Sequence, residues 1–328
     1  MSTPDARDSG RTARWWPLSF TLLALLWGAT FMFVKVGLEA LSPLQVAFGR
    51  VAFGAAFLVP VLLVMRDRLP RGWRVWGHLA VVALLFNSLP TTLIAAAETE
   101  ISSIAAGIWN ATTPLLTLVI ALAMLPEERL SRERAAGMGV GFAGVVVLLG
   151  PWAGIAGGAL LGNLAIFGAA ASYGVAFAYT RRYLAGRSES LVSLSTAQLL
   201  MATAQLLVVL PLGGAPPDAL PLDVVLSIVT MGALGTGLAY ILNYQVIRAV
   251  GATIASTVTY VVPVVSTVLG IVVLGEALAW NQPLGAAIVI AGVLVAQGRG
   301  VRGLRSSTRR RTPDPTAGTR PAESIQEP

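Results

Sequence analysis

Ten apolar runs, each close to the length of a membrane helix, constrain this chain more than any other feature of its sequence. A helix that crosses a bilayer needs roughly 20 mostly apolar residues. Only 12% of the residues are charged, against about 25% in a soluble domain. We therefore predict an all-α membrane protein of ten transmembrane helices. The predicted spans are 18–38, 43–65, 75–96, 101–124, 134–151, 159–181, 190–211, 222–246, 251–274 and 281–298.

The basic residues indicate how these spans are oriented. If the N-terminus is cytoplasmic, all but two of the 23 Lys and Arg residues fall in cytoplasmic segments, and the outer loops contain none. The two exceptions, Lys35 and Arg50, lie within helices. Positive charge accumulates on the cytoplasmic side of membrane proteins. We expect a multi-pass protein of the bacterial inner membrane with both termini in the cytoplasm, comprising an N-terminal segment 1–17 and a disordered basic tail 299–328 drawn to anionic lipid.

Composition excludes several other classes of function. The net charge is +7, but the arginines lie between apolar runs rather than on one basic face, so we expect no nucleic-acid partner. The chain has no cysteine and one histidine, His78, which argues against a metal site. Its Gly-x-Gly strings lie inside apolar helices and lack a nucleotide-binding context. We expect no cofactor and no metal; the expected partners are a small-molecule substrate and the lipid bilayer, with a homodimer left open.

An internal repeat divides the chain into two halves, 18–151 and 159–298. Each half contains five predicted helices, and because five is odd the second half is inverted relative to the first. Inverted repeats are typical of secondary transporters, which bind their substrate between the halves. A static scaffold built by duplication is the alternative. The matches are Pro114 with Pro263 at an offset of 149 residues, Gly137 with Gly285 and Gly144 with Gly292 at 148, and Trp27-Gly28 with Tyr173-Gly174 at 146.

Two segments resemble a known family. They read ALLWGATFMFVKVGLEALSPLQVAFGR in the first two helices and GALGTGLAYILNYQVIRAVGATIASTVTYVVPVVSTVLGIVVLGEAL across the eighth and ninth. The halves resemble the EamA-type repeat of the drug/metabolite transporter superfamily over about residues 18–298. This resemblance implies a ten-helix carrier, either gradient-linked or a facilitator, and commonly an exporter of amino acids or related metabolites.

Two cations and one acid are the charged candidates for a site. Arg50 lies about seven residues into its helix, roughly 10 Å deep at 1.5 Å per residue, where it could attract an anionic group from a water-filled cavity. A cation at such a depth is costly and is usually functional or paired. Lys35 lies near the outer end of its helix, where snorkelling with Glu39 as partner is the alternative. Glu98 is a candidate proton site, with exposure to solvent as the competing interpretation.

Uncharged polar and aromatic residues complete the candidate binding site. Prolines free backbone carbonyls, and polar side chains beside such bends often line a cavity. The competing interpretation is that polar side chains join helices and that tyrosines belong to the membrane interface. The candidates for substrate binding are Trp27, Arg50, Asn87, Trp109, Asn110, Tyr173, Tyr240, Asn243 and Tyr260.

These observations favour a secondary transporter, not an enzyme, that moves a small metabolite by alternating access between the halves. The function that we predict is efflux of an amino acid or related organic solute. The alternative is a membrane-embedded enzyme or flippase acting on a lipid-linked substrate. Such a protein would need clustered Asp, Glu or His at the bilayer edge, and the outer loops are short and poor in catalytic residues.

Overall fold

The computed structural model describes residues 6–124, 132–149, 159–184, 189–217, 219–250 and 258–297, and within these ranges every regular element is a helix. The first half contains α1 (Ala6–Gly37), α2 (Pro43–Val64), α3 (Trp73–Ala83), η1 (Leu84–Ser88), α4 (Leu89–Glu98), α5 (Ser103–Trp109), η2 (Asn110–Thr112), α6 (Thr113–Met124) and α7 (Arg132–Leu149). The second contains α8 (Ala159–Tyr183), α9 (Leu191–Val209), η4 (Leu210–Gly213), α10 (Leu222–Gly232), η5 (Ala233–Leu238), α11 (Ala239–Val250), α13 (Val258–Val272) and α14 (Asn281–Gln297).

These helices form ten apolar spans, which confirms the predicted fold class. In the described residues seven spans reach at least 18 residues, and the apolar stretches of α7, α13 and α14 are shorter. Four spans join two or three segments end to end, for example α3, η1 and α4. Helix α1 begins at Ala6, so it extends into the predicted N-terminal segment, whereas the predicted tail 299–328 lies outside the described residues.

The second helix of each half begins with the same capping geometry. The hydroxyl of Ser42 accepts a hydrogen bond from the backbone N–H of Gln45, whose side chain accepts one from the N–H of Ser42. The hydroxyl of Ser190 accepts from the N–H of Ser193 at 3.0 Å. A serine at this position satisfies a backbone donor that the helix leaves free. The two serines are 148 residues apart, so the repeat extends to local structure.

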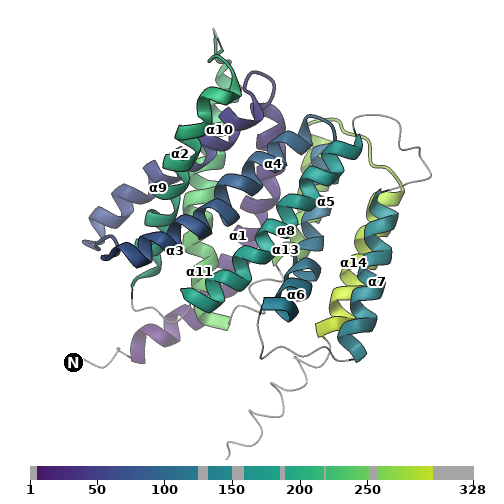
Figure 1. Ribbon diagram of the computed structural model, residues 1–328, viewed down its shortest axis with the longest axis horizontal. Coiled ribbons are helices and arrows are strands. Elements are labelled where there is room, and N and C mark those ends of the chain that lie inside the picture. Colours follow the sequence, from purple (N-terminus) through teal and green to yellow (C-terminus); the bar gives the residue numbers. More distant parts are fainter. Residues whose placement is uncertain are drawn as a thin grey trace, which may run out of the picture.

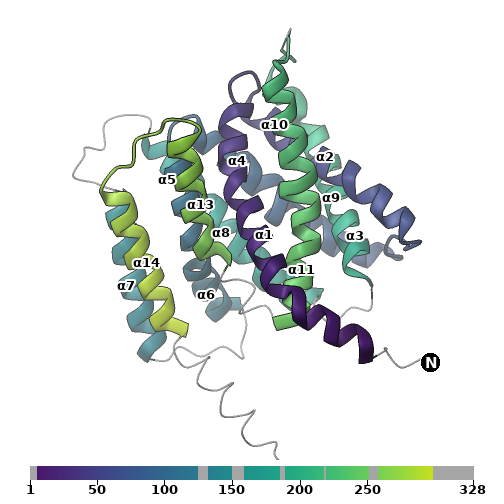
Figure 2. The same ribbon diagram turned by 180° about the vertical axis from the view of Figure 1, so that it is seen from behind.

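Packing between helices also repeats. Helix α1 packs against α13, and its counterpart α8 packs against α6; α1 also packs against α10 and α11, as α8 does against α4. Two pairs, α2 with α9 and α7 with α14, join equivalent helices of the two halves. Exchanging the halves therefore maps the helix contacts onto themselves, as expected of two inverted repeats related by a two-fold axis. In Figures 1 and 2 the α7–α14 pair lies at one edge of the bundle.

Glycines allow the α7–α14 pair to pack backbone against backbone. A Cβ atom added to Gly144 would lie 2.9 Å from the carbonyl oxygen of Gly285, and one added to Gly285 would lie 3.0 Å from that of Gly144. At the equivalent contact, a Cβ on Gly292 would lie 2.6 Å from the oxygen of Gly137. Small residues at a membrane helix interface permit this close approach. The predicted repeat glycines therefore form two symmetry-related contacts.

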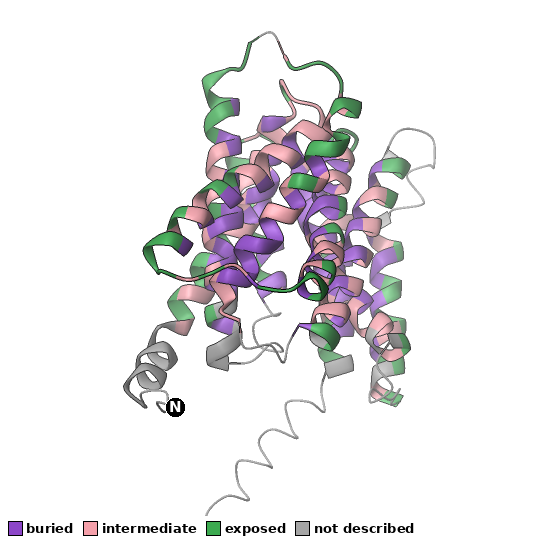
Figure 3. Cartoon of the chain, turned by 60° about the vertical axis from the view of Figure 1, so that its left-hand side comes forward, coloured by how far each residue is buried: buried purple, intermediate pink, exposed green. Residues whose placement is uncertain are grey.

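The distribution of burial suits a lipid environment. Buried residues gather in the middle of the bundle, and exposed residues follow the outward faces and the ends (Figure 3). Many outward-facing side chains are large and apolar, such as Leu161, Val208 and Val264. Helices satisfy their own backbone hydrogen bonds, so they can present such side chains to hydrocarbon. The polar side chains inside the bundle are therefore the ones whose positions need an explanation.

Candidate functional site: a central cavity

Two π-helical segments interrupt equivalent spans of the two halves. The segment η1 lies between α3 and α4, and η5 lies between α10 and α11. They begin 149 residues apart, which is the offset between Pro114 and Pro263. A π-helical turn inside an α-helix widens the helix and is frequent at functional sites. Both segments border the same cavity, because Asn87 of η1 and Thr236 of η5 line it.

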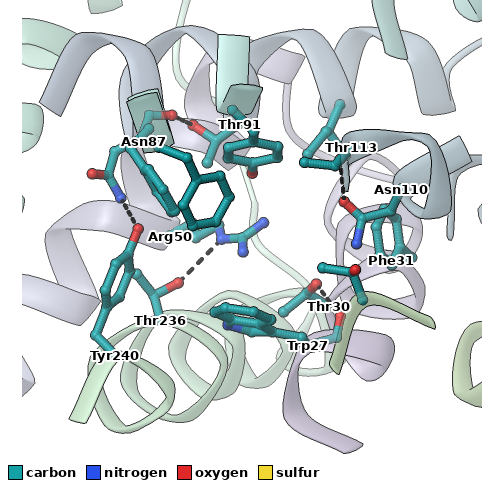
Figure 4. A pocket seen from close by; sticks show the side chains of 15 residues that line it. Trp27, Thr30, Phe31, Arg50, Asn87, Thr91, Asn110, Thr113, Thr236 and Tyr240 are labelled. Atoms are coloured by element: carbon teal, nitrogen blue, oxygen red, sulfur yellow. Dashed lines mark hydrogen bonds between the residues drawn. The ribbon is translucent and has the colours of Figure 1, made fainter. Parts of the chain in front are cut away.

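This cavity lies between the two halves and is lined by residues of α1, α2, η1, α4, η2, α6, α8, η5, α11 and α13. The space between the side chains is about 650 Å³ when its open part is counted. Sites for small molecules combine apolar walls with a few polar groups. Figure 4 shows the labelled side chains converging on this space from opposite sides. The mixed polar and aromatic lining suits a small organic solute.

Most of the lining comes in pairs that the repeat relates. Trp27 and Phe31 of α1 lie one turn apart and line the cavity, as do their counterparts Tyr173 and Phe177 of α8, at an offset of 146 residues. Three further pairs follow the offset of 149: Asn87 with Thr236, Thr91 with Tyr240, and Asn110 with Thr259. The cavity therefore lies on the two-fold axis that relates the repeats.

Two hydrogen bonds beside the cavity are related in the same way. The Nε of Arg50 on α2 donates to the hydroxyl of Thr236 at 3.1 Å. The Nε2 of Gln198 on α9, 148 residues after Arg50, donates to the Oδ1 of Asn87 at 2.6 Å. The Nδ2 of Asn87 then donates to the hydroxyl of Tyr240 at 2.8 Å. The hydrogen bonds of Arg50 and Gln198 each join the second helix of one half to the π-helical segment of the other half. Both therefore connect the two halves.

Arg50 is where the two halves differ in charge. It is half-buried, and it is the charged residue among those that line the cavity. Within the described residues its hydrogen bond to Thr236 accounts for Nε, and no carboxylate pairs with its terminal nitrogens. A guanidinium has five N–H donors, four of them on these terminal nitrogens. The cavity therefore contains an unshared cation with donors available to a ligand.

Six of the nine residues predicted to bind substrate line this cavity: Trp27, Arg50, Asn87, Asn110, Tyr173 and Tyr240. The other three do not belong to its lining. Trp109 is buried, and its Nε1 donates to the Oδ1 of Asn163 at 2.8 Å. Asn243 is buried, and Tyr260 packs against the largest apolar cluster. Trp109 instead borders a second recess, together with Asn163 and Ser102.

Lys35 and Glu98 lie together at the end of the bundle predicted to be outermost. The Nζ of Lys35 donates to the backbone oxygens of Glu98 at 2.7 Å and Ile101 at 3.2 Å, rather than pairing with Glu39. Glu98 is 0% exposed, which contradicts the competing interpretation of a solvated acid, and both its carboxylate oxygens lack a hydrogen-bond partner. The packing of α4 against α8 and α1 covers this end of the helix.

Glu276, in the loop after α13, has the hydrogen-bond donors that Glu98 lacks. The carboxylate of Glu276 accepts hydrogen bonds from the backbone N–H groups of Ser103 at 2.9 Å and Ile104 at 3.0 Å, and from the Ser103 hydroxyl at 2.8 Å. Glu276 therefore joins the loop after α13 to the start of α5. Among the described residues no group of three His, Cys, Asp or Glu side chains could hold a metal ion.

Several lining residues were missed by sequence reasoning, above all Thr236, Thr259 and Phe177. The internal repeat identifies all three. Phe177 lies 146 residues after Phe31, which is one turn from the candidate Trp27. Adding 149 to Asn87 and Asn110 gives Thr236 and Thr259.

Comparison with known proteins decides the family. The model of the EamA-like transporter family matches the chain twice, over residues 14–150 and 160–297. The chain is a member of the EamA-like transporter family. It is thus a multi-pass membrane transporter, which confirms the predicted family and the prediction of a transporter rather than an enzyme. The two matches lie on either side of the break between the halves.

The relatives of this EamA-like chain agree with that assignment. The uncharacterized transporter YoaV of Bacillus subtilis is 25% identical over 85% of this chain and 95% of its own length. The uncharacterized inner membrane transporter YedA of Escherichia coli is 28% identical over 86% of this chain and 92% of its own. A protein of known crystal structure is 23% identical with a TM-score of 0.62, covering 87% of this chain and 98% of its own, and shares the fold.

Proposed function

We propose that this chain is a secondary transporter that exports a small organic solute by alternating access of the central cavity. The observation that carries the proposal is the lining of the cavity by equivalent residues of both halves. Two near-equivalent halves can exchange conformations, so that one cavity opens first to one side and then to the other. The moving units are the repeats 18–151 and 159–298. One chain lines the whole cavity, so binding does not require a homodimer.

The sequence supports the location and the direction that we propose. The arginine distribution supports an inner-membrane protein with both termini in the cytoplasm. The relative YedA is named as an inner membrane transporter, which agrees with this location. Export of amino acids or related metabolites is the direction and class that the family resemblance suggests.

The two π-helical segments are suitable places for the spans to bend during this exchange. A π-helical turn leaves the regular hydrogen-bond ladder of the helix, so its rearrangement costs less than breaking an α-helical turn. The hydroxyl of Thr236 in η5 donates to the backbone oxygen of Met231 in α10, five residues earlier. Because Arg50 binds the same hydroxyl, a ligand at Arg50 would act directly on the interrupted part of the span.

Glu98 is the group that we propose for coupling transport to an ion gradient. A buried carboxyl without hydrogen-bond donors is costly to keep charged, so it gains from a proton or from a donor supplied by a rearranged helix. Lys35 lies beside it but binds backbone oxygens. Replacing Glu98 with Gln should leave binding in the cavity intact and remove the dependence of flux on a pH gradient. Flux that follows the gradient in Glu98→Gln would exclude this role.

The test is flux into proteoliposomes over a panel of amino acids, nucleosides, organic acids and cationic drugs, with and without a pH gradient. At least one solute should exchange through the wild-type protein, and Arg50→Ala should abolish that exchange without loss of membrane insertion. Arg71→Ala is the matched control, because Arg71 is exposed and remote from the cavity lining. Transbilayer movement of lipid in the same vesicles without solute flux would instead favour a flippase.

A further inference from the structure

We infer that the transported solute is a small organic monocarboxylate with a flat apolar body, bound through its carboxylate to Arg50. This inference rests on the proposed function and narrows its substrate class from amino acids and related solutes to organic anions without an ammonium group. The inference follows from three properties of the cavity: an unshared guanidinium, walls without acidic side chains, and a cluster of aromatic rings.

The guanidinium of Arg50 is held in place for a ligand. Its Nε is fixed by Thr236, and its terminal nitrogens have no partner among the described residues. In Figure 4 it points into the space between Trp27, Tyr240 and Asn110. A carboxylate binds two N–H groups of an arginine side by side, with shorter and stronger bonds than between neutral groups. An intramembrane cation that forms no direct ion pair with a carboxylate of the described residues is a place for an anionic ligand.

The described part of the lining supplies no opposite charge for a positive group. None of the described lining residues is Asp or Glu, and the polar ones besides Arg50 are Thr, Asn and Tyr. Glu98 is not among them and is completely buried. An amine would therefore meet Arg50 as a like charge, and the ammonium of an amino acid would lose its hydration without an opposite charge in return. A dianion would find one cation for two charges.

Aromatic rings give the rest of the ligand its surroundings. The ring of Phe86 lies 5.3 Å from that of Tyr173, 5.0 Å from Phe177 and 6.0 Å from Tyr240, centroid to centroid. All four residues line the cavity, and Trp27 lines it as well. Aromatic faces and edges favour stacked or edge-on contact with flat apolar groups. A carboxylate joined to a ring or planar chain matches both parts of the cavity.

A matched set of probes tests this inference on the purified full-length protein. The set shares one phenyl body and differs in its polar end: 3-phenylpropionate, 3-phenylpropanamide, 3-phenylpropylamine and phenylalanine. Binding is measured by calorimetry in lipid nanodiscs at neutral pH. We expect 3-phenylpropionate to bind at least about tenfold more tightly than the amide, the amine or the zwitterion, because a bidentate charged bond is lost or opposed in each of these.

Variants locate the preference. Arg50→Gln should abolish the advantage of the carboxylate over the amide, and Arg50→Lys should retain only part of it, because an ammonium cannot bind two oxygens in a planar fork. Arg71→Gln, the same change at an exposed position, should leave it unchanged. If Arg50→Gln fails to fold, as judged by size-exclusion chromatography, Arg50→Lys decides the point on its own, and an undiminished carboxylate preference in that variant contradicts the inference.

The outcome distinguishes this inference from the proposed function. Equal or tighter binding of the amine or of phenylalanine would overturn the assigned substrate class, while flux of that solute would leave the transporter intact. Conversely, tight binding of 3-phenylpropionate with no flux of any solute would support the site and contradict transport. Binding and flux of the carboxylate, both lost in Arg50→Gln, would support the two proposals together.

Discussion

The α7–α14 pair and the central cavity both lie on the two-fold axis, but they use the repeat in different ways. In the helix pair glycine is matched by glycine: Gly137 corresponds to Gly285, and Gly144 to Gly292. In the cavity the positions are matched, but apart from Phe31 and Phe177 the residues are not. There Asn110 corresponds to Thr259, and the same divergence places a charge in one half alone, at Arg50.

This difference has a physical cause. Two equivalent helices that meet on the axis face the same steric demand, and only residues without a side chain satisfy it on both sides. A solute in the cavity has no two-fold symmetry, so equivalent positions contact different parts of it. Helix packing thus keeps the same residue at equivalent positions of the two halves, whereas binding of a solute favours different residues there. Positions where equivalent residues differ most in charge, as Arg50 and Gln198 do, are therefore the most informative about the solute.

The largest effect that we expect comes from the α7–α14 pair. In Gly292→Ala the new Cβ would lie 2.4 Å from the backbone nitrogen of Gly141 and 2.6 Å from the carbonyl oxygen of Gly137. Backbone atoms cannot move aside as a side chain can, so the helices must separate. We expect a loss of about 3 kcal/mol of stability, measured as a lower midpoint of thermal unfolding in detergent.

Gly139→Ala is the control for that experiment. It introduces the same methyl group on α7, but at a position with no atom within 4 Å of the new Cβ. Its unfolding midpoint should stay at the wild-type value or rise slightly, because alanine favours a helix more than glycine does. Equal midpoints for the two variants would mean that the close contact of α7 with α14 does not hold the pair together.

The second effect comes from the residue that breaks the symmetry of the cavity. Arg50→Gln gives both halves glutamine at this position, and we expect transport to fall about 100-fold, equivalent to about 2.7 kcal/mol. The double variant with Gln198→Arg returns one charge to the equivalent place. We expect no recovery, because Gln198 is buried behind Asn87 and does not line the cavity. Recovery would show that the two halves are interchangeable in binding. Flux of the solute found in the panel is the measurement.

Most of the fold could be predicted from the sequence because membrane helices obey simple rules. The length of each apolar run fixes a span, the arginines fix alternate loops, and an odd number of spans per half inverts the second half. What escaped prediction was local. The residue types of the π-helical segments η1 and η5 do not distinguish them from the α-helices on either side. The burial of Glu98 depends on how α4 packs against other helices.

The candidate site was predictable in part, for a related reason. A polar residue in an apolar span is easily recognised, and Arg50, Asn87 and Asn110 all line the cavity. The sequence does not show which face of a helix points inward, so Asn243 was included although it lies outside the lining. Application of the repeat offset to each candidate would have added Thr236, the partner of Arg50.

The third prediction concerns the hydrogen bond between Gln198 and Asn87, which is the uncharged counterpart of the one between Arg50 and Thr236. Asn87 accepts from Gln198 and donates to Tyr240, so Asn87→Leu, which keeps the branching and the number of heavy atoms of the side chain, removes both bonds. The amide of Gln198 then remains buried without this acceptor, and we expect a loss of about 2 kcal/mol of stability. Asn110→Leu is the control: its hydrogen bond with Thr113 is long, at 3.5 Å. Thermal unfolding should separate the two variants, and equal midpoints would remove the structural role of Asn87.

The smallest effect that we expect comes from Thr236, which accepts the hydrogen bond of Arg50. This prediction tests whether Thr236 positions Arg50 or binds the solute directly. Thr236→Val removes the hydroxyl that accepts from Arg50 but keeps the shape of the side chain. Arg50 can still bind an anion through its terminal nitrogens, so its affinity for a carboxylate should fall only about fivefold, near 1 kcal/mol. The loss should be shared by all carboxylate probes and absent for neutral amides, because Thr236 acts on the solute through the guanidinium. A larger loss, or one that also affects the amides, would mean that Thr236 contacts the solute itself and that the two symmetry-related hydrogen bonds serve different purposes.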